Sequence, residues 1–249
     1  MILMIFCRLL RAGRYFRHIL ISFAVLMVAD ARASTILKSG TFAGMKVDYK
    51  VVLPNGFDPA RAYPAVLAFA SGPQNMRMVD IDLKGYWAEE AERRGYIVIS
   101  PAAPTDQLFF ENNDRIFPEF LDMILRDYRV LGGKLHVAGP SSGGISAFHV
   151  ATLYPKYFWS VTVFPGYLDD TTDPMVEQLK PICIYMYVGE RDKDWEKAMK
   201  QQSQLFERKG STVKYSIEED QGHELDLGPD ELDGLFDDLE AASKGCGKK

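Results

Sequence analysis

Residues 135–155 read LHVAGPSSGGISAFHVATLYP, and this stretch decides the fold of the chain. An apolar run typical of a buried strand, residues 135–139, leads into a turn of small residues, and a helical pattern follows. The turn matches Gly-x-Ser-x-Gly, with Ser141 between Gly139 and Gly143. A serine in a sharp strand-to-helix turn is exposed as a nucleophile, and it needs small residues two positions away because larger side chains would clash there. The alternative is a tight turn that at most binds an anion at the helix N-terminus.

Short apolar runs alternate with longer amphipathic runs along the rest of the chain. The predicted strands are residues 46–54, 65–70, 96–100, 135–139, 160–164, 182–188 and 212–218. The predicted helices are residues 84–95, 116–128, 144–155, 195–210 and 231–242. Strands separated by helices indicate an α/β fold with a mostly parallel sheet and helices on both of its faces. The short connection between the strands at 160–164 and 182–188 leaves no room for a large lid domain.

A serine nucleophile needs a base and an orienting carboxylate, and in hydrolases with this elbow the chain order is serine, acid, histidine. Two histidines follow Ser141 in the sequence. His149 lies about two turns along the predicted helix, where we interpret it as a packing residue. His223 follows the last predicted strand in a polar loop. The chain order therefore predicts His223 as the base.

The acid is expected in the loop after the strand at 182–188, which reads Gly-Glu-Arg-Asp-Lys-Asp at 189–194. Glu190 is still close to the strand end, and Asp194 occupies the position expected of a helix N-cap. We therefore predict Asp192 as the acid, with Asp194 as the alternative that the spacing leaves open.

The first 33 residues have the layout of a secretory signal peptide. Four arginines precede the apolar run ILISFAVLMVA at 19–29, and the small-residue motif Ala-Arg-Ala at 31–33 precedes Ser34. A membrane anchor is the alternative, but the apolar run is shorter than the roughly 20 residues that a spanning helix needs. We predict that residues 1–33 are cleaved and that residues 34–249 form a single domain, exported to the periplasm or outside the cell without stable membrane insertion.

The chain is acidic, with 29 Lys and Arg residues against 34 Asp and Glu residues and a formal net charge of −5. The predicted leader holds five of the basic residues and one of the acidic residues, so the mature chain is more acidic still. This charge and the lack of a basic run argue against nucleic acid or anionic lipid as a partner. The four histidines have no metal-ligand spacing and the three cysteines no CxxC motif, so we expect no metal and no cofactor.

Two cysteines remain after the leader, Cys183 and Cys246, too few for a disulfide framework. Cys183 lies in the apolar run ICIYMYV and is interpreted as a small buried hydrophobic residue. The sequence leaves open whether the two cysteines pair, and the tail after Ser243 is expected to be loose.

Several segments resemble the α/β-hydrolase superfamily, in particular the secreted esterase branch that contains feruloyl esterases and polyhydroxybutyrate depolymerases. The segments are YPAVLAFASGPQN, WAEEAERRGYIVISPAAP, LHVAGPSSGGISAFHVATLYPKYFWSVTVFPG, YMYVGERD and QGHEL, and the resemblance as a whole covers about residues 46–226. The resemblance implies a serine ester hydrolase with Ser141, Asp192 and His223 as its triad, acting through an acyl-enzyme on a small-molecule or polymer-linked ester. A peptidase or acyltransferase with the same triad, or an inert binding protein with this fold, are the alternatives.

The loop at 70–73 departs from that branch, which usually has His-Gly here, whereas this chain reads Ala-Ser-Gly-Pro. Pro73 has no N–H to donate. We therefore expect the oxyanion to be bound by the backbone N–H of Ser142 and by one further N–H from Ser71 or Gly72.

Without a lid, the site is expected to be an open cleft at the strand ends. Residues 104–117 contain Phe109 and Phe110, which either form an aromatic wall of this cleft or pack beneath the loop.

Overall fold

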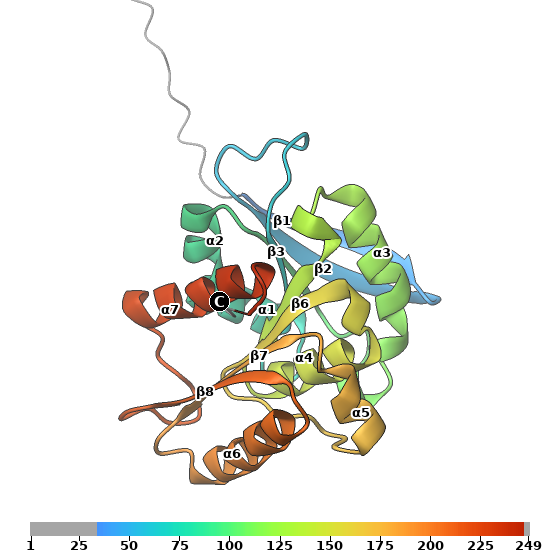
Figure 1. Ribbon diagram of the computed structural model, residues 1–249. Helices are drawn as coiled ribbons and strands as arrows, with labels where there is room; N and C mark the ends of the chain where they lie inside the picture. Colours follow the sequence, from blue (N-terminus) through green and yellow to red (C-terminus); the bar gives the residue numbers. More distant parts are fainter. Residues whose placement is uncertain (1–33, 247–249) are drawn as a thin grey trace, which may run out of the picture. The chain divides into compact units, whose positions relative to one another are not determined.

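A single sheet of eight strands organises the chain, and the computed structural model describes residues 34–246 (Figure 1). The strands are β1 (Ser34–Phe42), β2 (Met45–Leu53), β3 (Ala65–Ala68), β4 (Ile97–Pro101), β5 (Leu135–Gly139), β6 (Phe158–Val163), β7 (Cys183–Gly189) and β8 (Thr212–Glu218). Their order in the sheet is β1-β2-β4-β3-β5-β6-β7-β8. Strand β2 is antiparallel to both of its neighbours, and the other neighbouring pairs are parallel. The predicted α/β class with a mostly parallel sheet and no large lid is confirmed.

Helices and a π-helical segment connect the strands. They are α1 (Met76–Asp82), the π-helical segment (Leu83–Trp87), α2 (Ala88–Arg94), α3 (Phe117–Asp127), α4 (Ser142–Leu153), α5 (Asp173–Gln178), α6 (Lys193–Arg208) and α7 (Pro229–Ser243). None of the helices within residues 34–246 is long and apolar enough to cross a membrane. The predicted leader at 1–33 lies outside the described residues.

Three elements were absent from the sequence prediction: strand β1 and helices α1 and α5. Most side chains of β1 are exposed or half-buried, so its sequence has no apolar alternation. Helices α1 and α5 contain seven and six residues, too few to show a helical repeat. The sequence thus gives no signal for β1 because the strand is mostly exposed, and none for α1 and α5 because these helices are short.

The core lies in two layers, one on each face of the sheet. Successive residues of β3 point to opposite sides, so that Leu67 joins one cluster of buried side chains and Val66 the other. The Leu67 cluster includes buried residues of α3, α4 and α6, and the Val66 cluster includes those of α1, α2 and α7. Strands β3, β4, β5 and β7 are buried at every position. Polar side chains that act on a ligand must therefore lie at the strand ends, where parallel sheets bind their ligands.

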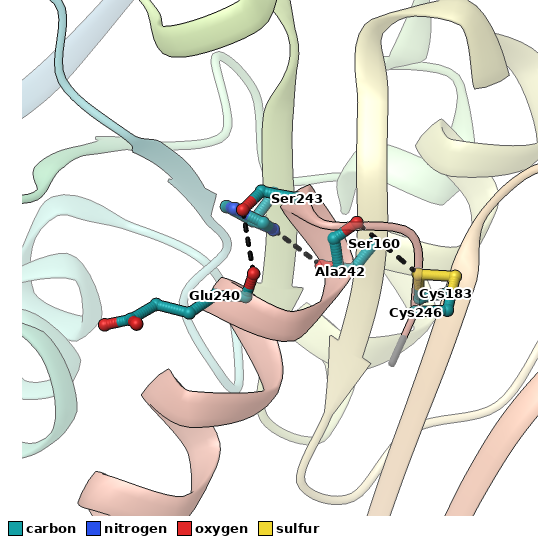
Figure 2. Close-up of a disulfide and its surroundings, with 7 residues drawn as sticks. Ser160, Cys183, Glu240, Ala242, Ser243 and Cys246 are labelled. Atoms are coloured by element: carbon teal, nitrogen blue, oxygen red, sulfur yellow. Dashed lines mark hydrogen bonds between the residues drawn. A yellow bond between two sulfur atoms is a disulfide. The ribbon is translucent and has the colours of Figure 1, made fainter. Parts of the chain in front are cut away.

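A disulfide fastens the chain beyond α7 to the sheet. Cys183 at the start of β7 is bonded to Cys246, with the two Cα atoms 5.5 Å apart (Figure 2). Cys183 is buried, as expected, but it is not a free thiol. The prediction of a loose tail after Ser243 is wrong for residues 244–246, because the disulfide holds them against β7.

Helix α7 also packs on α2 through an ion-pair network. The guanidinium of Arg94 lies 2.6 Å from a carboxylate oxygen of Asp233 and 2.7 Å from one of Asp237. Beneath these charges the rings of Trp87 and Phe236 are 5.9 Å apart. The segment that carries α7 is thus held by a covalent bond at its end and by charge and aromatic contacts along its length.

Candidate active site

Ser141 lies in the sharp turn between β5 and α4, with the backbone angles φ 54° and ψ −122°. Such a conformation in a non-glycine residue costs about 1–3 kcal/mol and persists only where its surroundings hold it. The Ser141 N–H donates to the Pro165 carbonyl (2.7 Å), and the Ile145 N–H donates to the Ser141 carbonyl (3.1 Å). The turn therefore has the strand-turn-helix geometry of a nucleophile elbow.

Close backbone approaches explain the glycines around Ser141. A Cβ atom on Gly139 would lie 2.6 Å from the carbonyl carbon of Gly143, and one on Gly143 would lie 2.5 Å from the carbonyl oxygen of Phe69. A Cβ atom on Gly144, which the Gly-x-Ser-x-Gly pattern does not include, would collide with the Pro165 carbonyl oxygen. The expected need for space around the serine is real, and it extends to a third glycine.

Ser141, His223 and Asp192 form a continuous hydrogen-bonded chain. The Nε2 atom of His223 lies 2.9 Å from Ser141 Oγ, and its Nδ1 atom lies 2.6 Å from Asp192 Oδ2. Ser141 follows β5, Asp192 follows β7 and His223 follows β8, so the three side chains meet at the carboxyl edge of parallel strands. The structure brings together the three residues that the sequence singled out.

Contacts between the loops after β7 and β8 set the distance between Asp192 and His223. The Arg191 N–H donates to the Gln221 carbonyl (2.8 Å). A Cβ atom on Gly189 would collide with the backbone at Gly222, so the two loops can approach this closely only because residue 189 is a glycine.

The competing carboxylates of the β7 loop have other surroundings. Glu190 accepts a hydrogen bond from the Asp220 N–H (3.2 Å), and Asp194 lies in the first turn of α6. Helix α6 begins at Lys193, so Asp192 itself is the N-cap residue, and its carboxylate contacts His223 instead of capping the helix. The sequence argument therefore selected Asp192 while placing the N-cap two residues too late, at Asp194.

His149 is separate from this chain of residues. Its ring nitrogens lie 3.3 Å from Asp169 and 3.6 Å from Asp114. Burial of the ring lowers the pKa of His149, but the hydrogen bonds and charges of the two aspartates outweigh burial and raise the pKa overall. Within residues 34–246 no group of three His, Cys, Asp or Glu side chains has the arrangement to hold a metal ion.

The two candidate oxyanion donors in the loop after β3, the N–H groups of Ser71 and Gly72, differ in their surroundings. The Ser71 N–H donates to the buried carboxylate of Asp82 (2.6 Å), which removes Ser71 from the expected pair of oxyanion donors. Burial raises the pKa of this Asp82 carboxyl. Gly72 is the member of the pair that stays a candidate, and its carbonyl accepts a hydrogen bond from Ser142 Oγ (2.7 Å). The Ser142 N–H opens α4 and has no acceptor within the helix, as at any helix N-terminus.

A cavity of about 410 Å³ adjoins Ser141 and His223. Its other walls are the loop at Ser71 and Gly72, apolar side chains of α1, and the segment 224–227. The carboxylates of Asp82, Glu224 and Asp226 make it acidic. The expected open site at the strand ends is thus present, with a mixed apolar and acidic lining.

Aromatic residues near the site differ from those the sequence suggested. Phe109 is completely buried and packs against Phe69, with ring centroids 5.1 Å apart, so it lies beneath the loop and forms no wall of the cavity. Trp195 instead lies edge-to-face on the His223 ring at 4.9 Å, and Tyr167 packs on Trp195 at 4.8 Å. The only sequence signal for Trp195 is its position three residues after Asp192.

The sheet order, the elbow and the position of the site at the carboxyl edge define an α/β-hydrolase. The model of the Esterase family matches residues 40–231, and the chain belongs to this family.

Individual proteins resemble the chain in part of its sequence or in its fold. The chain is 29% identical over 133 residues to dipeptidyl-peptidase 5 of Porphyromonas gingivalis, a match that covers 47% of this chain and 19% of that protein. A ferulic acid esterase structure superimposes with a TM-score of 0.62 at 16% identity, covering 86% of this chain and 99% of the other. An S-formylglutathione hydrolase from Agrobacterium tumefaciens superimposes with a TM-score of 0.63 at 15% identity, and the match covers 87% of this chain and 97% of the other. The chain thus spans about a fifth of the curated relative, whereas the two structures share its fold over nearly their whole length.

Proposed function

We propose that the protein is a serine ester hydrolase in which Ser141 is the nucleophile, His223 the base and Asp192 the orienting acid. The observation that carries this proposal is the hydrogen-bonded chain from Ser141 Oγ through the His223 ring to the Asp192 carboxylate. Membership of the Esterase family supports ester bonds as the target.

In the first half-reaction, Ser141 Oγ attacks the ester carbonyl carbon while its proton passes to His223 Nε2. The Nδ1–H donates to Asp192 and stabilises the imidazolium that forms. The imidazolium then protonates the leaving alcohol, and the acyl group stays on Ser141. In the second half-reaction, His223 takes a proton from a water molecule as the water oxygen attacks the acyl carbon. The imidazolium then returns this proton to Ser141 Oγ as the acyl–oxygen bond breaks and the acid leaves.

The tetrahedral oxyanion is bound by the backbone N–H groups of Ser142 and Gly72. The Ser142 N–H belongs to the first residue of α4, where the helix dipole adds positive potential. Loss of one such donor lowers kcat by about 10²–10³-fold in serine hydrolases, so the position of the 71–74 loop governs the rate.

The substrate is a small-molecule or polymer-linked ester. A cavity of about 410 Å³ without a lid admits a small acyl or alcohol group and leaves the rest of a larger ester outside. Its carboxylates at Asp82, Glu224 and Asp226 favour an uncharged or cationic group over an anionic one. The predicted leader would direct the protein to the periplasm or outside the cell, where such esters are met.

Amide hydrolysis is the second candidate activity, because a curated relative of the chain is a dipeptidyl-peptidase. The same three side chains serve peptidases and esterases on many folds. Matched p-nitrophenyl esters and p-nitroanilides of one acyl group distinguish the two activities by their kcat/KM ratio.

The test is hydrolysis of short-chain p-nitrophenyl esters, together with labelling by a fluorophosphonate probe. We expect Ser141→Ala to abolish both, and Ser243→Ala, which changes a serine at the end of α7, to leave both unchanged. Folded wild-type protein that neither hydrolyses esters nor takes up the probe would leave an inert binding protein as the remaining function. Ser142→Ala is unsuitable as the control because Ser142 Oγ bonds the loop at Gly72.

A further inference from the structure

Gln74 is a completely buried polar residue in the loop between β3 and α1. Its backbone has φ 52°, in the left-handed region that non-glycine residues seldom adopt. The Gln74 N–H donates to the Ser71 carbonyl (3.2 Å), which closes the turn that contains Gly72. The Gln74 carbonyl accepts from the Ala103 N–H (2.8 Å), so the turn is also fastened to the chain after β4. The backbone of Gln74 therefore holds the turn that presents the Gly72 N–H.

The side chain of Gln74 reaches the other donor segment. Its Nε2 atom donates to the Ser142 carbonyl (3.2 Å) and to Ser146 Oγ (2.9 Å), both on α4. Its Oε1 atom accepts from the Phe109 N–H (3.0 Å). A side-chain amide has two N–H donors and one acceptor oxygen, which is the set that these three partners require. A carboxylate would turn an acceptor oxygen toward the Ser142 carbonyl, and an apolar side chain would leave the Phe109 N–H unpaired.

We infer that Gln74 is a positioning residue that sets the separation of the two oxyanion donors, the N–H groups of Gly72 and Ser142. The two donors belong to segments far apart in the sequence, so only contacts between the segments hold their spacing. Gln74 is in the turn of the first donor and is hydrogen-bonded to the residue of the second. A second hydrogen bond, from Ser142 Oγ to the Gly72 carbonyl, also joins the two segments. Donors that are fixed in advance stabilise an oxyanion, and a displacement of about 1 Å lowers the rate roughly 10²-fold.

The inference rests on the proposed function, and its test compares Gln74→Met, which keeps the length of the side chain, with the wild type. Each protein is titrated with the fluorophosphonate probe, so that kcat is expressed per reactive serine. We expect kcat on p-nitrophenyl acetate to fall about 10–100-fold with KM within twofold, because the donors act in the transition state. The affinity for a trifluoromethyl ketone, which forms a tetrahedral oxyanion adduct on the serine, should fall by the same factor as kcat/KM.

Ser160→Ala is the matched control, since Ser160, which is labelled in Figure 2, is completely buried. Ser160 lies in β6, and its Oγ is hydrogen-bonded to His136 of β5 (2.8 Å). We expect it to lower the melting temperature and leave kcat unchanged. A Gln74→Met protein that melts earlier but keeps its kcat and its ketone affinity would overturn the inference and leave the proposed function intact. A wild type without esterase activity would overturn both.

Ser146→Ala decides the question if Gln74→Met does not fold. It removes one acceptor of the Gln74 amide in the middle of α4, where alanine is a good helix former. We expect kcat to fall about fivefold with KM unchanged, which corresponds to the loss of one hydrogen bond of about 1 kcal/mol. An unchanged kcat would contradict the role of Gln74.

Discussion

The two halves of the candidate site are held in different ways. In the nucleophile half, Ser141 is enclosed by glycines whose neighbours are backbone atoms, and Gln74 behind it is completely buried. In the base half, the His223 side chain is 40% exposed and follows β8, a strand with no fully buried position. The first half is thus positioned by core packing, and the second by hydrogen bonds between loops and by the tether of the chain at Cys246. We expect changes in the first half to damage fold and activity together, and changes in the second to separate them.

The largest expected effect is loss of activity without loss of stability in the base half. His223→Ala should lower kcat by about 10⁴-fold or more, because it removes the proposed base of the serine. Its melting temperature should stay near that of the wild type, since the side chain is 40% exposed. Ester hydrolysis and calorimetry measure the two quantities. His149→Ala, outside the hydrogen-bonded chain, should retain activity within a few-fold, and equal losses in the two variants would refute the assignment.

Removal of the disulfide should have the next largest effect, a decrease in the free energy of unfolding. Cys183 and Cys246 are 63 positions apart, and the bond encloses β8, the His223 loop and α7. In the chain-entropy account, opening a loop of this length lowers the free energy of unfolding by about 4 kcal/mol. Urea unfolding with and without dithiothreitol should show this difference. Cys246→Ser should match the reduced protein and no longer respond to the reductant, and a stability equal to that of the oxidised wild type would contradict the tether.

A substitution at the elbow should affect stability and activity at once. Gly143→Ala places a Cβ atom 2.5 Å from the Phe69 carbonyl oxygen, and the backbone shift that relieves this contact lowers the free energy of unfolding by about 3 kcal/mol. The shift also displaces the Ser142 N–H, so kcat falls with it. Denaturant unfolding and kinetics measure both.

Gly234→Ala, at a position in α7 with open space around it, is the control for that substitution. It should stabilise the protein by about 0.5–1 kcal/mol because alanine favours the helix. If Gly143→Ala has the stability of the wild type, the nucleophile half is not positioned by core packing, and the contrast with the base half is wrong.

The smallest expected effect concerns pH and His149. Asp169 and Asp114 raise the pKa of His149 in the folded protein above the unfolded value of about 6.5. The folded state therefore binds this proton more tightly, which stabilises the protein fully below the unfolded pKa and no longer once the pH has risen through the folded pKa. The free energy of unfolding of the wild type relative to His149→Gln should thus decrease from pH 6 to pH 8.5, by less than about 1 kcal/mol. A difference that is constant across this range would show that the pair adds no proton-linked stability.

Local patterns carried most of the fold and much of the candidate site. The strands β5 and β8 have the predicted boundaries, because each is an apolar or alternating run between clear turn residues. The elbow was visible because its steric demand falls on residues adjacent in sequence. Chain order indicated the loops that hold Asp192 and His223, since later parallel strands end at the same edge of the sheet as β5. Within the first of these loops, position relative to the strand end and to the expected N-cap singled out Asp192.

Features that depend on partners distant in sequence escaped this reasoning. Ser71 and Gly72 were indistinguishable as candidate donors, because the feature that separates them is the Asp82 carboxylate, which accepts a hydrogen bond from the Ser71 N–H. Gln74 has no local signature, since its role lies in contacts with α4 and with Phe109. The pairing of Cys183 with Cys246 depends on where α7 packs against the sheet.

The sequence by itself determined the class of fold, the elbow around Ser141 and the order in which the acid and the base follow. Those properties follow from hydrophobic periodicity, from the spacing of glycines and from the order of segments along the chain, all of which can be read without knowing the three-dimensional structure. Only the tertiary structure decided which N–H of the 71–72 loop is paired with the Asp82 carboxylate, which contacts join this loop to α4 and what fastens the base half. The physical reason is that a hydrogen bond or a disulfide depends on distances of a few ångströms between segments that the chain brings together only when its core has packed.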